Sequence, residues 1–287
     1  MGYKKTALAW CRHRDGWYSP TNQLEIARIH EPGRSNMEKP HCQVCGGTDC
    51  PPHAARGEWH YRRCATCGLV FLSPMLDDAT LAALYANPDS GGTRAYFRKE
   101  ASKLRRARGR VRHMANAVAG GPNGRRFLDV GCSGGFMTQA ALEAGFTATG
   151  IDPDSDAVAH ARENYPGADY LVGGLTDVAA KFSEDFDAVY CSEVLEHVAD
   201  ANAFVGAIAG VMAAGGVLYL TTPDIGHWRR PKNLADWDVF TPPHHCLFFS
   251  VGNLRQLFHR YGLEIFHRQW AFKPGLKVLA RKIGNTT

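Results

Sequence analysis

The stretch Phe127-Leu128-Asp129-Val130-Gly131-Cys132-Ser133-Gly134-Gly135-Phe136 says most about the fold of this chain. Its apolar start predicts a buried strand, its glycine-dense centre a tight turn, and residues 137–144 a helix that ends at Gly145. Glycine permits positive φ angles and lets a ligand approach the backbone, and the first turn of a helix has unpaired N–H groups. The stretch therefore predicts a cradle for polar atoms of a nucleotide cofactor.

A second apolar run, residues 147–151, ends in Asp152. A carboxylate at the end of a strand can accept hydrogen bonds from both hydroxyls of a ribose. Nicotinamide cofactors favour the spacing G-x-G-x-x-G, whereas this turn reads G-C-S-G-G. The predicted cofactor-binding residues are Asp129, Gly131, Cys132, Ser133, Gly135, Asp152, Pro153 and Glu193.

These two segments resemble motifs I and II of class I S-adenosylmethionine methyltransferases, and the resemblance continues through residues 186–198 and 214–224. It implies S-adenosylmethionine as methyl donor and an α/β fold with a Rossmann-like, seven-stranded sheet. Ser133 departs from the pattern, because many relatives carry a second glycine there. Serine is small enough to keep the turn.

The rest of the chain alternates between strand-like and helix-like patterns. Strands are expected at 168–172, 186–191 and 217–221, helices at 155–165, 203–212 and 250–261, and a closing hairpin from 263–272 and 276–281. Such alternation predicts parallel strands joined by crossover helices. Chemistry in these sheets takes place beyond the C-terminal ends of the strands, here beside Gly131, Asp152 and Glu193.

Four of the nine cysteines form two C-x2-C pairs, each followed by glycine. They are Cys42, Cys45, Cys64 and Cys67. This spacing predicts a zinc ribbon over residues 41–75, with Cys50 as the nearest substitute ligand. The alternative is two disulfides or buried thiols, which a reducing compartment disfavours. Four thiolates leave no open position on the metal, so the role would be folding or partner presentation.

Hydrophobic residues make up 45% of the chain, enough for a large core, and no apolar run approaches membrane-spanning length. We expect a cytoplasmic protein without a membrane span. The expected domains are a poorly ordered leader (1–40), the zinc ribbon (41–75), a helical linker (76–120) and the methyltransferase domain (121–287). Met37 is an alternative start, because it lies just before the first recognisable element.

Residues 94–112 hold nine basic residues and one acid, Glu100. Apolar residues recur there at helical spacing: Phe97, Ala101, Leu104, Ala107, Val111 and Met114. The pattern favours an amphipathic helix whose charges face water. With the net charge of +5, it also permits an anionic partner such as a nucleic acid.

Residues 242–250 resemble a P-x-H-x3-F-S signature at the rim of the active site in many S-adenosylmethionine enzymes, with His245 at the motif histidine. Histidine can accept a hydroxyl proton near neutral pH, so His245 is the first catalytic candidate and His244 the second. The alternative is that His245 only braces its loop.

Glu193, Glu196, His197 and His245 together resemble the constellation of metal-dependent small-RNA 2′-O-methyltransferases. Two carboxylates and two imidazoles could hold a divalent cation that binds vicinal hydroxyls. The alternative is structural, since the same residues can cap and brace a helix.

The function expected from the resemblance is methylation of a hydroxyl on a small or carbohydrate-like acceptor, because ribbon-bearing methyltransferases resemble those of surface-polysaccharide and deoxysugar pathways. Residues 225–249 are the expected acceptor lid, with aromatic and histidine side chains at His227, Trp228, Trp237 and Phe240. The alternatives are an RNA methyltransferase that grips phosphates with the ribbon and basic helix, and a catalytically silent zinc-ribbon binding protein. The acceptor, its methylated atom and the oligomeric state stay open.

Overall fold

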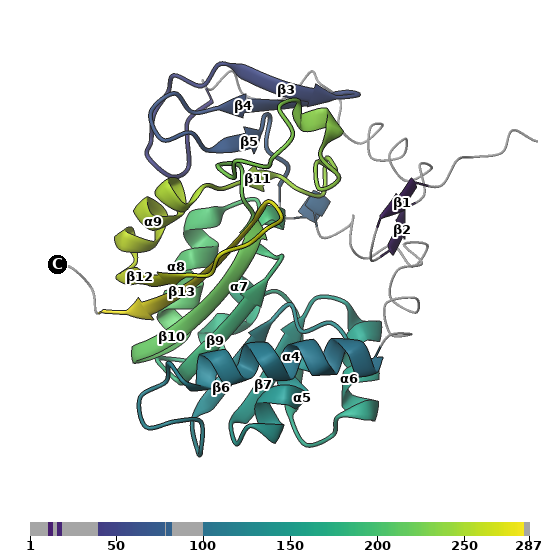
Figure 1. The fold of residues 1–287 in the computed structure, drawn as a ribbon, viewed down its shortest axis with the longest axis vertical. Helices are drawn as coiled ribbons and strands as arrows, with labels where there is room; N and C mark the ends of the chain where they lie inside the picture. Colours follow the sequence, from purple (N-terminus) through teal and green to yellow (C-terminus); the bar gives the residue numbers. More distant parts are fainter. Residues whose placement is uncertain (1–10, 14–15, 19–39, 78, 82–99, 284–287) are drawn as a thin grey trace, which may run out of the picture.

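The computed structural model describes residues 11–13, 16–18, 40–77, 79–81 and 100–283. Its largest element is a seven-stranded sheet of order β12-β13-β10-β9-β6-β7-β8 (Figure 1). The five strands from β10 to β8 are parallel, and β13 runs antiparallel to its neighbours β10 and β12. The strands are β6 Arg126–Val130, β7 Thr147–Asp152, β8 Asp169–Val172, β9 Phe186–Ser192, β10 Met212–Pro223, β12 Leu263–Arg268 and β13 Gly275–Lys282. The predicted α/β fold with a Rossmann-like, seven-stranded sheet is confirmed.

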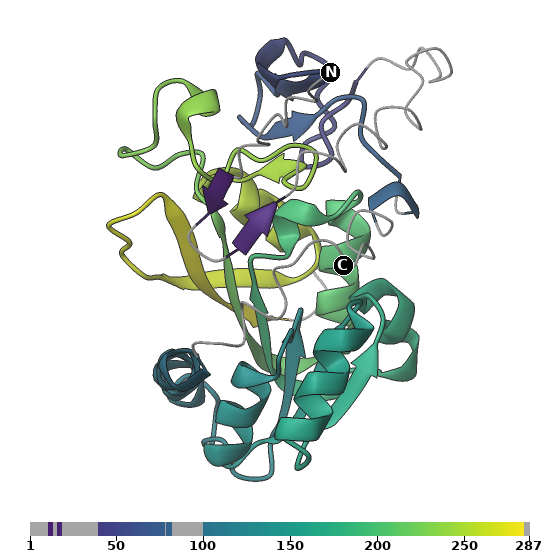
Figure 2. The same ribbon diagram turned by 90° about the vertical axis from the view of Figure 1, so that its right-hand side faces the viewer.

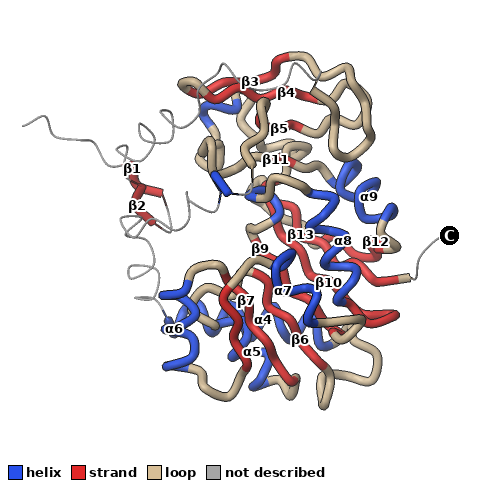
Figure 3. Tube along the Cα trace, turned by 180° about the vertical axis from the view of Figure 1, so that it is seen from behind, coloured by secondary structure: helices blue, strands red, loops and turns tan. Residues whose placement is uncertain are grey.

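Helices cover both faces of this sheet, as the opposite views of Figures 1 and 3 show. The helices are α4 Glu100–Ala115, α5 Phe136–Glu143, α6 Ser155–Asn164, α7 Leu175–Val178, α8 Ala201–Val211 and α9 Val251–Arg260. Short 3-10 turns are η2 Ala179–Lys181, η3 Leu195–His197 and η4 Leu234–Asp236. Predicted elements agree with these bounds within a few residues, except that the strand expected at 217–221 is the end of the longer β10.

The core has two parts because side chains on a strand alternate between its faces. On β9, Ala188 and Tyr190 join the cluster under α4, α5 and α6, whereas Val189 and Cys191 join the cluster under α7, α8 and α9. The central strands are therefore buried on both sides. This double burial holds the C-terminal ends of the strands in fixed positions, which is where the candidate site lies.

Helix α4 is the described part of the predicted basic helix, and it packs against α5 and the sheet. Ala107, Val111 and Met114 are buried, as the apolar spacing predicted, whereas Ala101 is exposed and Phe97 lies outside the described residues. On the polar side, the Arg108 guanidinium pairs with Glu143 of α5 at 2.6 Å.

The cysteine module, residues 40–76, forms a second sheet of order β11-β5-β4-β3 (Figure 1). Its strands are β3 Pro52–Arg56, β4 Trp59–Arg63 and β5 Val70–Leu72, and β11 Leu247–Phe248 joins them from far along the chain. The buried residues of the module belong to the same cluster as α8, α9 and one face of the large sheet. The module is thus packed onto the large domain through a continuous core.

Within the predicted leader, the structure describes one antiparallel pair, β1 Cys11–His13 with β2 Gly16–Tyr18. The rest of that segment before Pro40, including Met37, lies outside the described residues, as do residues 82–99 of the predicted linker. In the described part of the chain, no helix is both long and apolar enough to cross a bilayer.

Candidate cofactor and acceptor site

The turn between β6 and α5 is pinned to the end of β7. The N–H groups of Gly131 and Cys132 both donate to the Ile151 carbonyl at 2.9 Å. Ser133 has a positive φ of 45°, a conformation that L-residues rarely adopt. The predicted strand, turn and helix are therefore present, and Ser133 adopts a backbone conformation that glycine would take without strain.

Two glycines of the turn are required for space. A Cβ on Gly131 would lie 2.7 Å from Val194 Cγ2, and one on Gly135 would lie 2.9 Å from Ala161 Cβ and from the Tyr170 hydroxyl. Both also have positive φ, 74° and 79°. Glycine thus lets the turn pack closely against the segments after β7 and β9.

Asp152 lies at the end of β7 with its carboxylate fixed by backbone N–H groups. Oδ2 accepts a hydrogen bond from Ser133 N at 2.8 Å, and Oδ1 accepts one from Asp154 N at 2.9 Å. Burial raises the pKa of this carboxyl. Each carboxylate oxygen has a second lone pair, so Asp152 can still accept two ligand hydroxyls. Pro153, between the two aspartates, is exposed.

Asp129 is placed differently from Asp152. It is buried, and its Oδ2 accepts from Thr138 N at 3.1 Å and from Thr138 Oγ1 at 2.8 Å. These bonds tie the first turn of α5 to β6. Burial raises the pKa of Asp129 to about 7. The observed contacts of Asp129, which was predicted to bind the cofactor, are therefore structural ones that hold α5 against β6 below the turn.

The raised pKa of Asp129 predicts a pH-dependent stability. The unfolded carboxyl ionises near pH 4 and the folded one near 7, so its contribution is fully present below about pH 4 and is lost as pH rises to about 7. We expect the unfolding free energy of the wild type, relative to Asp129→Asn, to fall by about 4 kcal/mol between pH 4 and pH 8. Urea unfolding of both proteins across this range measures it. A constant difference would contradict it.

Glu193 follows β9 at the same edge of the sheet, with a positive φ of 55°. Its N–H donates to the Thr221 carbonyl at 2.9 Å, and its Oε1 accepts from Thr221 Oγ1 at 2.7 Å. The residue is exposed. Glu193 therefore joins the ends of β9 and β10, one residue before Val194, which packs against Gly131.

Glu196, His197 and His245 form a compact group, with one ligand atom from each within 4.8 Å of the others. Glu193 does not belong to this group. Glu196 is buried, and its Oε2 accepts from Thr222 Oγ1 at 2.9 Å. Burial and the neighbouring Glu193 carboxylate raise the pKa of Glu196.

The His197 tautomer follows from its partner. Its Nδ1 lies 2.8 Å from the His244 carbonyl oxygen, which can only accept, so Nδ1 carries the proton and Nε2 keeps a lone pair. Burial lowers the pKa of His197 to about 4, so the ring is neutral. The His245 ring stands edge-on to it, with centroids 4.5 Å apart. His244 thus contributes through its carbonyl, and burial lowers the pKa of its side chain.

The predicted acceptor lid is corrected at three of its four named residues, because His227, Trp237 and Phe240 are buried. Trp237 and Phe240 are 3% and 0% exposed, so they cannot form a platform for an acceptor. Phe240 packs on Tyr61 of the cysteine module at 4.8 Å between centroids, and Trp237 packs on Phe248 at 5.7 Å. The cysteine module covers the Phe240 ring, and residues 225–249 alone do not reveal this contact, whereas Trp237 is covered by Phe248 of the same segment.

Trp228 is the exposed aromatic residue of the lid, at 75%, whereas His227 is buried and its Nε2 bonds to the Ala271 carbonyl. Two further exposed aromatic residues, Trp270 and Phe272, lie in the loop between β12 and β13, which Figure 2 shows projecting from the sheet. The Arg229 guanidinium lies 3.8 Å from the Phe272 ring centroid. Trp270 and Phe272 were not identified from the sequence, because they lie outside the segment predicted as the lid, residues 225–249.

Arg110 is a second residue that sequence reasoning missed, since it is one of many cations in its helix. Its guanidinium donates to the Tyr190 hydroxyl, and the Tyr190 ring stacks on Tyr219 with centroids 5.4 Å apart. Among the described residues it forms no ion pair. A half-buried cation on α4 that has no carboxylate partner among the described residues and contacts Tyr190 on β9 is suited to an anionic ligand group.

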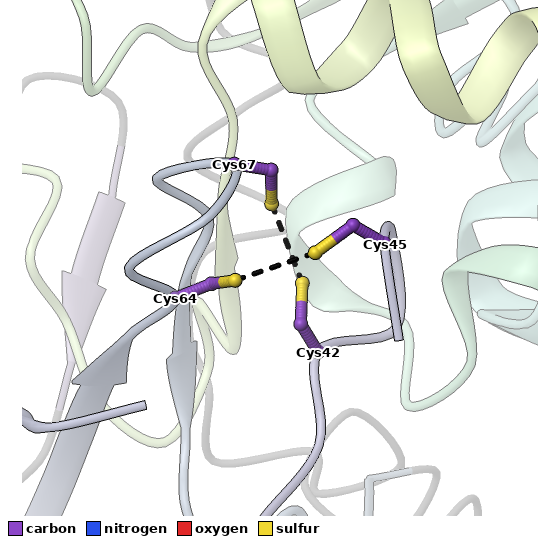
Figure 4. Close-up of side chains that lie close together, drawn as sticks. All are labelled: Cys42, Cys45, Cys64 and Cys67. Carbon is purple, nitrogen blue, oxygen red and sulfur yellow. Dashed lines mark hydrogen bonds between the residues drawn. The ribbon is translucent and has the colours of Figure 1, made fainter. Parts of the chain in front are cut away.

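The four predicted metal ligands come together in the cysteine module, where their sulfurs point to a common centre (Figure 4). The Sγ atoms of Cys42 and Cys67, and those of Cys45 and Cys64, are 3.4 Å apart. Four sulfurs at 2.3 Å from a tetrahedral zinc would be separated by about 3.8 Å. The donor set and its spacing therefore fit zinc.

The turns that carry the four cysteines support this fit. Gly46 and Gly68 follow the pairs with positive φ of 72° and 78°. The pKa of Cys42 is lowered to about 5 by the Cys67 thiol and by N–H groups of Val44 and Cys45, which outweigh the opposing effect of burial. Cys50 lies outside the four-sulfur group and bonds to the Gly47 carbonyl.

A glycine turn after one parallel strand and a carboxylate after the next define a Rossmann-like nucleotide-binding protein. The chain belongs to the family described as a methyltransferase domain, whose sequence pattern matches residues 97–268.

Curated relatives agree over a shorter region. The chain is 42% identical over 105 residues to a ubiquinone biosynthesis O-methyltransferase of Xanthomonas axonopodis pv. citri, covering 35% of this chain and 44% of that protein. It is 38% identical over 108 residues to the enzyme of the same name from Escherichia coli O127:H6, covering 36% and 45%. The chain thus spans under half the length of these relatives.

Solved structures show the same fold. The 1,6-didemethyltoxoflavin-N1-methyltransferase of Burkholderia thailandensis superposes with a TM-score of 0.55 at 15% identity, covering 81% of this chain and 99% of that one. Magnesium protoporphyrin IX methyltransferase of Synechocystis PCC 6803 gives 0.52 at 17% identity, covering 73% and 99%.

Proposed function

We propose that the protein transfers a methyl group from S-adenosylmethionine to a hydroxyl of a small acceptor. The observation that carries the proposal is the Asp152 carboxylate, held by two backbone N–H groups beside the glycine turn with lone pairs left for a ribose. Family membership and relatives named O-methyltransferases support it. We place the protein in the cytoplasm in this proposal, because the cysteines of the module form no disulfide and the cytoplasm keeps thiols reduced.

In this proposal the chain holds S-adenosylmethionine from three sides. Asp152 accepts from the ribose hydroxyls, the turn at Gly131 lies against the cofactor, and Arg110 pairs with the carboxylate of its methionyl part. When bound, the cofactor supplies an electrophilic methyl group on a sulfonium. His245 accepts the acceptor hydroxyl proton as the oxygen attacks that methyl group.

The test of the proposal is the affinity for S-adenosylmethionine. Asp152→Ala removes two hydrogen bonds to a charged acceptor, each worth about 1.5–3 kcal/mol, so binding should weaken at least about a hundredfold. Isothermal titration of both proteins measures this, and Asp154→Asn, which alters only the cap of α6, is the matched control. Equal affinity of Asp152→Ala and the wild type would remove Asp152 from the cofactor site, and a wild type that binds no cofactor would overturn the function.

A divalent cation is the second candidate ligand, at Glu196, His197 and His245. One observation favours it: Oε1 of the buried Glu196 has no hydrogen-bond partner within the described part of the chain. His197 has a lowered pKa and is neutral, which is the state that metal ligation requires, and the His244 carbonyl fixes its ring. A cation there would bind vicinal hydroxyls of the acceptor, which suits sugars and catechols alike.

A further inference from the structure

The backbone of His245 lies between the cysteine module and η3. Its carbonyl accepts a hydrogen bond from the Tyr61 hydroxyl at 2.7 Å, and the next carbonyl, of Cys246, accepts one from Leu72 N at 2.8 Å. From the other side, Cys246 N donates to the Glu196 carbonyl at 2.7 Å. Residues 245 and 246 are thus held from both sides at once.

Tyr61 is built into the module. It lies on β4, the strand that leads into Cys64, and is 1% exposed. Its ring contacts Phe240 and Phe248, with centroids 4.8 Å and 6.0 Å away. Burial raises the pKa of its hydroxyl, so the group stays protonated and remains a donor. The position of the hydroxyl is therefore set by the strands next to the metal-ligand turns.

We propose that Tyr61 is a positioning residue through which the cysteine module sets the place of the His245 imidazole. This inference rests on the proposed function, in which His245 accepts the proton of the acceptor. Under this inference the cysteine module supports the residue that receives the acceptor proton, His245. The module has no role in binding the cofactor.

The two sides of the site are held in place by different hydrogen bonds. The groups proposed for the cofactor, Asp152 and the turn at Gly131, lie at the ends of β7 and β6 and are pinned to one another. The His245 ring instead faces His197, 4.5 Å away, on the segment that follows β9. A small displacement of a reacting group lowers the rate even when the ligand is still bound. Loss of the Tyr61 hydroxyl should therefore act on turnover and spare cofactor affinity.

The experiment compares Tyr61→Phe with the wild type as full chains. The variant keeps the ring contacts and removes one hydrogen bond. In protein with isotope-labelled histidine, the NMR signal of the His245 imidazole, identified by its loss in His245→Gln, should shift. With 3,4-dihydroxybenzoate as a catechol probe, kcat should fall about tenfold, while the Kd for S-adenosylmethionine stays within about twofold.

The matched control is Tyr261→Phe, which removes a hydroxyl bonded to Asn202 beside the module and away from His245. It should leave the His245 signal and kcat unchanged. An unchanged His245 signal in Tyr61→Phe would overturn the inference, whether or not the catechol is turned over. The affinity of the wild type for S-adenosylmethionine is measured first. If the wild type does not bind this cofactor, the proposed function is wrong, independently of the result for Tyr61→Phe.

Discussion

Replacing His245 with alanine is expected to lower the turnover number by roughly 10²–10⁴ and to leave the affinity for S-adenosylmethionine nearly intact. The reason is that, in the proposed function, proton transfer by the imidazole matters only in the transition state, whereas Asp152 and the turn contribute to cofactor binding in the ground state. Single-turnover methyl transfer and isothermal titration measure the two quantities separately. A His245→Ala enzyme with wild-type turnover on its true acceptor would eliminate the catalytic role.

His244→Ala is the matched control for this prediction. The His244 carbonyl, which fixes the His197 ring at 2.8 Å, is retained in the alanine variant. Because only a side chain outside the three-residue group is removed, the loss of turnover should be much smaller than in His245→Ala.

The metal hypothesis changes the expected pattern. If a cation is held by Glu196, His197 and His245, then Glu196→Ala should be as damaging as His245→Ala, and a brief chelator treatment should abolish activity. Metal retained by the cysteine module is measured in the same sample, so that loss of that metal is not mistaken for loss of the catalytic one. Full activity after the treatment would leave His245 as a base without a metal.

The parts of the site that sequence predicts well are local. The turn at Gly131 and the carboxylate at Asp152 hold each other within a single strand-turn-helix-strand unit, residues 126–152, so the pattern of strand, glycine and acid in that short stretch was sufficient. The two cysteine pairs are a similar case, since each turn is local and only their convergence needed the fold.

The parts that sequence missed depend on contacts between distant segments. Phe240 looked like an acceptor platform, but Tyr61, far earlier in the chain, covers it. Strand β11 is two residues long, too short for any periodicity, and exists because β5 pairs with it. Arg110 stands out from its basic neighbours only by its hydrogen bond to Tyr190, on a strand that follows much later.

Serine replacement of both Cys42 and Cys64 is expected to remove one zinc per chain, together with the fold of residues 41–72. Structural zinc sites of this kind contribute about 10 kcal/mol or more to folding, far above what the short strands β3, β4 and β5 could supply. Elemental analysis and limited proteolysis of the purified variant measure the two losses. Cys50→Ser is the matched control and should keep its zinc, because Cys50 lies outside the four-sulfur group. Zinc-free wild-type protein from a purification without chelator would refute the site.

Because the core of the module continues into that of α8 and α9, the double variant should also loosen the segment at His245, whose carbonyl accepts a hydrogen bond from the Tyr61 hydroxyl. Methyl transfer should therefore fail in this variant even where S-adenosylmethionine still binds.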